Sequence, residues 1–143
     1  MEENPVHRNF ICLEGKEIAW ASDVVTIEEL RGQADWDDGV DIVLEGEPDR
    51  EVHVGECFDL RLRPHFRRRV ILILVNHREV RMRRRVATGI QIKEEAIAQG
   101  VAVRLDFALF KVDGDKLMPI KDAEAVRLHE REEFRCVAPD DNS

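Results

Sequence analysis

The apolar residues of this chain alternate in short runs, and the same order of runs occurs twice. In the first half, residues 10–13 and 18–20 alternate around Glu14-Gly15-Lys16, which predicts a β-hairpin. Thr26 is followed three residues later by Glu29, the spacing of a capping box, in which each side chain binds an unpaired amide at a helix start. A short helix is therefore expected from this point to about Ala34.

Strand patterns fill the remainder of both halves. After the first helix, strands are predicted at residues 40–44, 52–54 and 58–62, and Pro64 ends the last of them. The second half repeats the order, with strands at 70–75, 80–82, 103–112, 117–120, 123–126 and 134–137. Its helix begins after Thr88 as N-cap and ends at Gly100.

In each half, a hairpin is followed by a helix that must cross the sheet to bury both apolar faces, and the last strand then returns beside the first. This is the β-grasp topology, so the predicted fold class is α+β with two tandem β-grasp (ubiquitin-like) domains. The expected division is a flexible tail at 1–8, domains at 9–66 and 67–138, and a flexible tail at 139–143, with residues 64–69 as the linker. A single α+β domain with one mixed sheet is the alternative. The expected core residues are Leu30, Ile42, Phe58, Leu60, Ile73, Ile97, Phe107 and Phe134.

Length and composition indicate a folded protein of ordinary type. The 143 residues are 43% apolar and 36% charged, which excludes a low-complexity disordered chain. No apolar run approaches the roughly 20 residues of a membrane span, and the acidic N-terminus lacks the pattern of a signal peptide. Cys12, Cys57 and Cys136 are widely spaced, as expected for reduced thiols in the cytoplasm.

Charge is distributed unevenly. Residues 1–60 contain 17 acidic and 4 basic residues, residues 61–85 contain ten arginines and one glutamate, and residues 86–143 contain 12 acidic and 8 basic residues, so −13, +9 and −4 sum to −8. We expect a partner-binding basic patch composed of Arg67, Arg68, Arg69, Arg81, Arg83, Arg84 and Arg85. It could bind an acidic protein surface, the acidic first half of the chain or phosphates, or be a solvated face. Nucleic acid is disfavoured because no aromatic residues alternate with the arginines.

No catalytic motif is found in the sequence. There is no Gly-rich phosphate loop and no nucleophile elbow. His53 and Cys57 are four residues apart but flank Gly55 in a predicted turn, and the acidic stretch at 35–39 lacks the final glutamate of a calcium loop. We therefore expect no catalytic residue, no metal and no cofactor, and a protein that is not an enzyme.

The tandem pattern at residues 10–30 and 70–97, together with the closing stretch Phe134-Arg135-Cys136-Val137-Ala138-Pro139, resembles the bacterial multi-ubiquitin-like family. These modifiers are encoded beside an activating enzyme, a conjugating enzyme and a JAB-type metalloprotease in anti-phage operons. The two units make the chain similar to the members that have been compared with the interferon-induced tandem modifier of vertebrates. The resemblance covers roughly residues 9–139.

The resemblance implies that the protein is a substrate of these three enzymes. Its C-terminus would be activated and joined to target proteins, such as phage tail proteins, in antiviral defence. The conjugation and processing segment would be Cys136, Val137, Ala138, Pro139, Asp140, Asp141, Asn142 and Ser143. Because this segment lacks the Gly-Gly ending of ubiquitin, the implied route needs trimming, or enzymes that accept this terminus. The alternative function is a tandem ubiquitin-like binding adaptor that is not conjugated.

Overall fold

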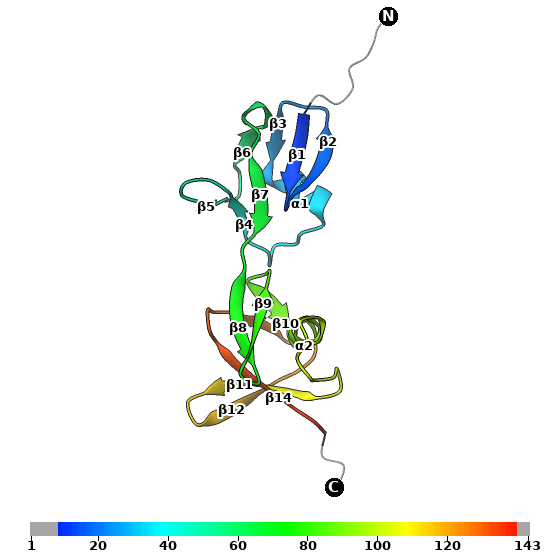
Figure 1. The fold of residues 1–143 in the computed structure, drawn as a ribbon, viewed down its shortest axis with the longest axis vertical. Coiled ribbons are helices and arrows are strands. Elements are labelled where there is room, and N and C mark those ends of the chain that lie inside the picture. The colour runs from blue at the N-terminus through cyan, green and yellow to red at the C-terminus, as the bar shows by residue number, and fades with distance from the viewer. Residues whose placement is uncertain (1–8, 140–143) are drawn as a thin grey trace, which may run out of the picture. The chain divides into compact units, whose positions relative to one another are not determined.

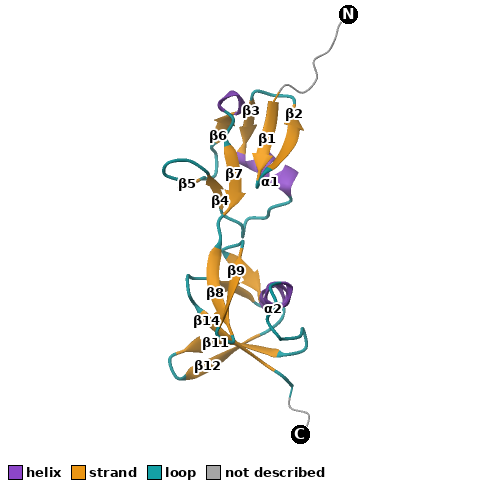
Figure 2. Cartoon of the chain, in the orientation of Figure 1, coloured by secondary structure: helices purple, strands orange, loops and turns teal. Residues whose placement is uncertain are grey.

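The computed structural model describes residues 9–139, and the chain divides into two compact units, unit 1 (Met1–Arg69) and unit 2 (Val70–Ser143). Each unit has mixed α and β structure and its own hydrogen-bonded sheets. Figures 1 and 2 show one α-helix beside the strands of each unit. No helix in the described part of the chain has the length and apolarity that a membrane span requires.

Unit 1 has seven strands, one α-helix and one 3₁₀ turn within its described residues. In chain order they are β1 (Asn9–Leu13), β2 (Lys16–Trp20), β3 (Val24–Thr26), α1 (Ile27–Ala34), β4 (Ile42–Leu44), β5 (Arg50–Glu51), β6 (Cys57–Asp59), the 3₁₀ turn (Leu60–Leu62) and β7 (His65–Arg68). Five strands form a sheet in the order β2-β1-β7-β4-β5, and β3 pairs with β6. Strand β7 runs parallel to β1, with Phe66 opposite Leu13.

Unit 2 repeats this arrangement. Its elements are β8 (Ile71–Val75), β9 (Arg78–Met82), β10 (Val86–Thr88), α2 (Gly89–Ala98), β11 (Ala108–Asp113), β12 (Lys116–Ile120), β13 (Ala125–Arg127) and β14 (Glu133–Val137). The sheet order β9-β8-β14-β11-β12 matches that of unit 1 strand for strand, and β10 pairs with β13 as β3 pairs with β6. Strand β14 runs parallel to β8, with Phe134 opposite Val75.

Both helices begin where the capping pattern predicts. The hydroxyl of Thr26 accepts from the amide of Glu29, whose carboxylate accepts from the amide of Thr26. Thr88 and Gln91 form the same pair at the start of α2. At the end of α2, Gly100 has φ +93°, a left-handed conformation that glycine adopts without steric cost.

Each unit buries its own apolar core between sheet and helix. Ile11, Leu30, Ile42 and Phe66 are at most 1% exposed in unit 1, where Phe58 packs edge-on against Phe66. In unit 2, Ile73, Val80, Ile92 and Phe134 are buried to the same extent. The predicted core positions Leu30, Ile42, Phe58, Leu60, Ile73 and Phe134 are confirmed.

Two core predictions are wrong or only partly right. Ile97 is 39% exposed, because α2 turns Ile92, Lys93 and Ala96 inward instead. Phe107 is only partly buried, and it lies in a loop rather than in the strand predicted from residue 103, since β11 begins at Ala108.

The interpretation of residues 64–69 as a linker is also wrong. His65–Arg68 form β7, which lies between β1 and β4 in the sheet of unit 1. Leu60 and Leu62, predicted as strand, form the 3₁₀ turn. The predicted boundary after Phe66 therefore falls inside β7, and Phe66 corresponds to Phe134 of unit 2.

Candidate functional site

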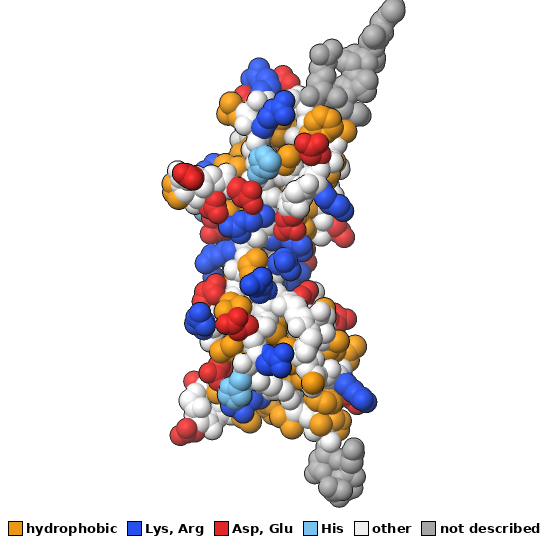
Figure 3. All heavy atoms as spheres, viewed as in Figure 1, with side chains coloured by type: hydrophobic (Ala, Val, Ile, Leu, Met, Phe, Trp, Pro, Cys, Tyr) orange, Lys and Arg blue, Asp and Glu red, His pale blue; other side chains and the backbone are white. Residues whose placement is uncertain are grey.

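The arginines predicted as one basic patch belong to two different settings. Arg67, Arg68 and Arg69 lie in unit 1, whereas Arg81, Arg83, Arg84 and Arg85 lie in unit 2. Basic side chains are visible on the surface of both units in Figure 3.

Arg67, Arg68 and Arg69 are all ion-paired with carboxylates of their own unit. Arg67 Nη2 lies 2.8 Å from Asp49 Oδ2, and its Nε lies 3.5 Å from Glu45 Oε2. Arg68 binds Glu14 through two side-chain nitrogens at 2.8 and 2.9 Å, and Arg69 Nη1 lies 3.6 Å from Glu51. These three side chains are satisfied internally, as in the interpretation that the basic residues serve the acidic first half of the chain.

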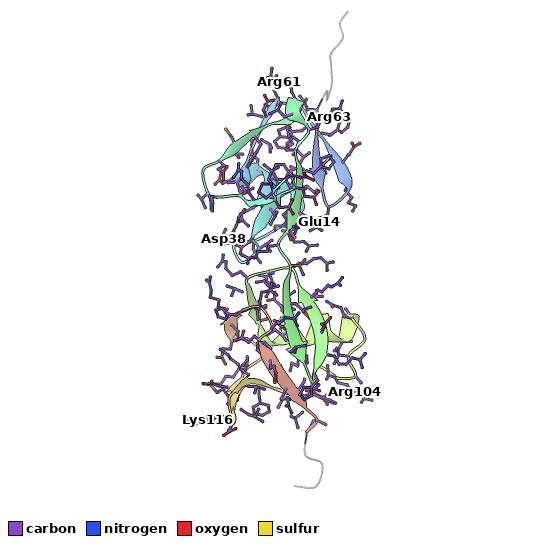
Figure 4. The ribbon with its side chains drawn as sticks, turned by 60° about the vertical axis from the view of Figure 1, so that its left-hand side comes forward. Glu14, Asp38, Arg61, Arg63, Arg104 and Lys116 are labelled. Carbon is purple, nitrogen blue, oxygen red and sulfur yellow. The ribbon has the colours of Figure 1, made fainter. Side chains whose placement is uncertain are left out.

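Arg68 is a charged residue on the inner side of β7, and two contacts accommodate it there. Its guanidinium lies over the ring of Trp36, 5.4 Å from the centroid. Both the cation–π contact and the Glu14 pair favour the charged form at this edge of the core. The Glu14 side chain is labelled in Figure 4.

Two of the predicted patch arginines in unit 2 differ from these. Arg81 and Arg83 are exposed, and neither side chain has an ion-pair partner among residues 9–139. Arg84 donates through Nε to the carbonyl of Val86, which fixes it to the backbone at the start of β10. The guanidinium groups of Arg81 and Arg83 therefore remain available for an acidic partner.

The predicted conjugation segment begins inside the fold. Cys136 is buried in β14, where its amide donates to Asn76 Oδ1 at 2.8 Å and its carbonyl accepts from Asn76 Nδ2 at 3.0 Å. Burial raises the pKa of the Cys136 thiol, with a smaller opposing effect from Lys93. Cys136 is therefore a structural residue.

The chain becomes accessible immediately after Cys136. Val137, the last residue of β14, is 47% exposed, and Ala138 and Pro139 are exposed beyond it. Ala138 and Pro139 lie along a hollow whose other side is the loop at residues 102–107, with Arg104 labelled in Figure 4. Asp140, Asp141, Asn142 and Ser143 lie outside the described residues.

The two side chains weighed as metal ligands lie on either side of an ion-paired glutamate. His53 and Cys57 are both exposed, and no group of three potential ligands is found within residues 9–139. Glu56, between them, instead binds Arg50 at 2.8 Å and accepts from the His53 amide. These bonds, the Arg50 contact first, lower the pKa of Glu56.

Sequence reasoning missed Lys93 and Arg135. Lys93 is 2% exposed on the inner side of α2, a position that its spacing from Gly89 and Ala96 on the helix could have revealed. Arg135 lies in β14 opposite Phe110 and has no ion-pair partner among the described residues. The alternation of Phe134 and Cys136 toward the core places Arg135 on the outer side.

Comparison with known proteins identifies no relative: no protein-family model matches the chain, and no curated protein sequence is significantly similar to it.

Proposed function

We propose that both units are β-grasp domains and that the chain is a tandem ubiquitin-like protein modifier. The observation that carries this proposal is the shared topology of the units. In each, a hairpin leads through a capped helix to a last strand that lies in the middle of the sheet, parallel to the first strand. Such a fold brings the C-terminal strand to the centre of the sheet and releases the chain at one end of it.

The chemistry of a modifier takes place at the chain's C-terminal carboxylate. An activating enzyme joins this carboxylate to AMP and releases pyrophosphate from ATP. A cysteine thiolate then displaces AMP to form a thioester, and an amine of the target displaces the thiol to form an amide. In this scheme the protein supplies a reactive end and recognition surfaces but no catalytic residue.

The end of β14 determines where such a tail can begin. Because Asn76 binds both backbone groups of Cys136, a partner enzyme can reach an extended chain only from Val137 onward. The sequence from Pro139 has no Gly-Gly, so we propose that a JAB-type metalloprotease trims the tail, or that the partner enzymes accept this ending. The proposed setting is antiviral defence in the bacterial cytoplasm, with phage proteins as targets.

The test is thioester formation with activating and conjugating enzymes encoded beside the protein. The intact chain and chains ending at Pro139, Ala138 and Val137 are each incubated with both enzymes and ATP, and adducts are resolved on gels with and without thiol. We expect at least one of these ends to give an ATP-dependent, thiol-sensitive adduct. Variants Arg81→Glu and Arg83→Glu should slow its formation most at low salt, because screening weakens exposed charge pairs.

The second candidate is a binding adaptor that is never conjugated. It is favoured by residues 137–143, which contain no glycine, whereas ubiquitin ends in Gly-Gly. If none of the four ends forms an adduct while the chain still binds the same enzymes, the modifier proposal fails and the adaptor function replaces it.

A further inference from the structure

The two units can be compared position by position, because their sheets share one strand order. Phe66 in β7 corresponds to Phe134 in β14, since each lies opposite the last residue of the first strand. One residue further along, Arg67 corresponds to Arg135. Their partners across the sheet are Val43 in β4 and Phe110 in β11. All four face the outer side of the sheet, away from the core residues that flank them.

In unit 1, the arginine at this outer position is already ion-paired. The turn between β4 and β5 supplies two carboxylates to Arg67, from Asp49 at 2.8 Å and Glu45 at 3.5 Å. Val43, beside Arg67, is only 6% exposed. Unit 1 therefore shows which chemistry satisfies an arginine at this position: carboxylates next to an apolar side chain.

In unit 2, the arginine at the same position is not ion-paired within the described residues. Arg135 has no carboxylate partner within the described chain, and the short turn between β11 and β12 does not reach it with Asp113 or Asp115. Phe110 is partly exposed, and Leu117 and Val137 on the same face are 50% and 47% exposed. Helix α2 covers the opposite side of this sheet.

Acidic residues also lie on this face, on the side of β14 away from its C-terminal end. Glu133 precedes Arg135 by two residues on the same side of β14, beside Leu74 and Glu79. Arg135 lies opposite Phe110, which pairs in turn with Pro119, and Val137 follows Arg135 on the same side of β14. Arg135 is thus flanked by apolar side chains on this face, and the combination complements a segment that carries a carboxylate beside a large apolar side chain.

We propose that the outer face of unit 2 formed by Phe110, Leu117, Pro119, Arg135 and Val137 is a docking surface for an acidic, apolar segment of a partner protein. The partner's carboxylate takes the place that Asp49 and Glu45 occupy in unit 1. Unit 1 lacks this function because its own turn already fills the site. The proposal does not depend on conjugation, since a modifier and an adaptor would use such a face equally.

The test uses the full chain and two synthetic peptides. One peptide alternates aspartate with leucine and phenylalanine, and the other has lysine in place of each aspartate. Each is titrated into isotope-labelled protein and followed by backbone amide signals. We expect the acidic peptide to shift the signals of Phe110, Arg135 and Val137. Arg135→Gln should weaken its binding about tenfold, as expected for loss of a charge-assisted contact at an interface.

Arg67→Gln is the matched control, because it removes the same side chain from the ion-paired position of unit 1. It should leave the affinity within a factor of two of the wild-type value. Binding of the lysine peptide as tight as that of the aspartate peptide would overturn the proposal, and so would equal weakening by both variants or no binding at all. If Arg135→Gln loses its folded spectrum, Arg135→Lys is tested in its place, again with Arg67→Gln as the control. Lysine keeps the positive charge but cannot form the two parallel hydrogen bonds of a guanidinium group.

Discussion

At the scale of single residues, Lys93 shows how a charge can occupy a core position. Its Nζ donates to the carbonyls of Leu105 and Phe107 at 2.7 and 2.9 Å, and to Asp122 at 2.7 Å. The three donors of the ammonium group therefore meet three acceptors, which compensates for its loss of water. These bonds attach the loop before β11 to helix α2.

Lys93→Met should destabilise unit 2 by about 2–4 kcal/mol, because the carbonyls of Leu105 and Phe107 and the carboxylate of Asp122 lose a charged donor. The measurement is chemical denaturation of the full chain followed by circular dichroism. Lys121→Met is the control: Lys121 is exposed, and its loss should change stability by about 0.5 kcal/mol or less. An equal effect of the two substitutions would mean that Lys93 does not hold the loop.

The acidic residues of unit 1 predict a loss of stability in acid. The pKa of Asp49 is lowered from its ordinary 3.8 by the amide of Gly46 and by Arg67. Arg61 does the same to the pKa of Asp59. A group whose pKa is lowered on folding stabilises the fold at pH values above its ordinary pKa, and that contribution disappears as pH falls through the lowered value.

Arg67→Gln should therefore lower the melting temperature of unit 1 at pH 7, and the difference from wild type should shrink as pH falls below about 4. Fluorescence is a suitable probe because Trp20 and Trp36, the tryptophans of the chain, both lie in unit 1. A difference that stays constant from pH 7 to pH 2.5 would contradict the role assigned to this ion pair.

At the scale of elements, the local signals in the sequence were reliable. The hairpins, the capping box at Thr26, the N-cap Thr88 and the end of α1 at Ala34 follow from short-range chemistry, and the structure confirms them. Strand β7 could not be recognised in this way. An arginine in a charge run is expected to be solvent-exposed, but Arg68 faces inward. Only the fold brings Glu14 and Trp36 to it from distant parts of the chain.

The same reason explains the misplaced core and site residues. Pattern analysis places Ile97 in the core and does not single out Lys93, whose acceptors come from a loop and from Asp122. Likewise, the arginine patch could be found as a charge run, whereas the pairing of Arg67 and Arg68 depends on acids far away in sequence.

Gly89 at the start of α2 makes a close contact that tests this part of the fold. A Cβ atom built there would lie 2.4 Å from the carbonyl oxygen of Lys121, so Gly89→Ala forces the backbone apart and should cost about 1–3 kcal/mol. Gly32→Ala in α1 is the matched control, because no atom lies within 4 Å of its Cβ. It should stabilise unit 1 by about 0.4–1 kcal/mol. Thermal unfolding of both variants gives opposite signs if the account is correct.

At the scale of the whole molecule, the separate cores predict that each unit folds without the other. The core clusters are formed by residues of one unit each. A fragment of residues 1–69 should retain a cooperative tryptophan fluorescence transition, whereas residues 1–64 should not, because they lack the central strand β7. Equal folding of both fragments would mean that unit 1 does not need β7 for its core.

The proposed modifier function rests on a C-terminus that leaves the centre of a sheet, and its most direct test is the covalent bond itself. The chain is mixed with its neighbouring activating enzyme and ATP, and the products are analysed by intact-protein mass spectrometry. The account predicts an adduct whose mass is that of the enzyme plus the chain, ending at or beyond Val137, less one water, and which disappears on treatment with thiol. An enzyme mass that stays unchanged with the intact chain and with every shortened end would contradict it.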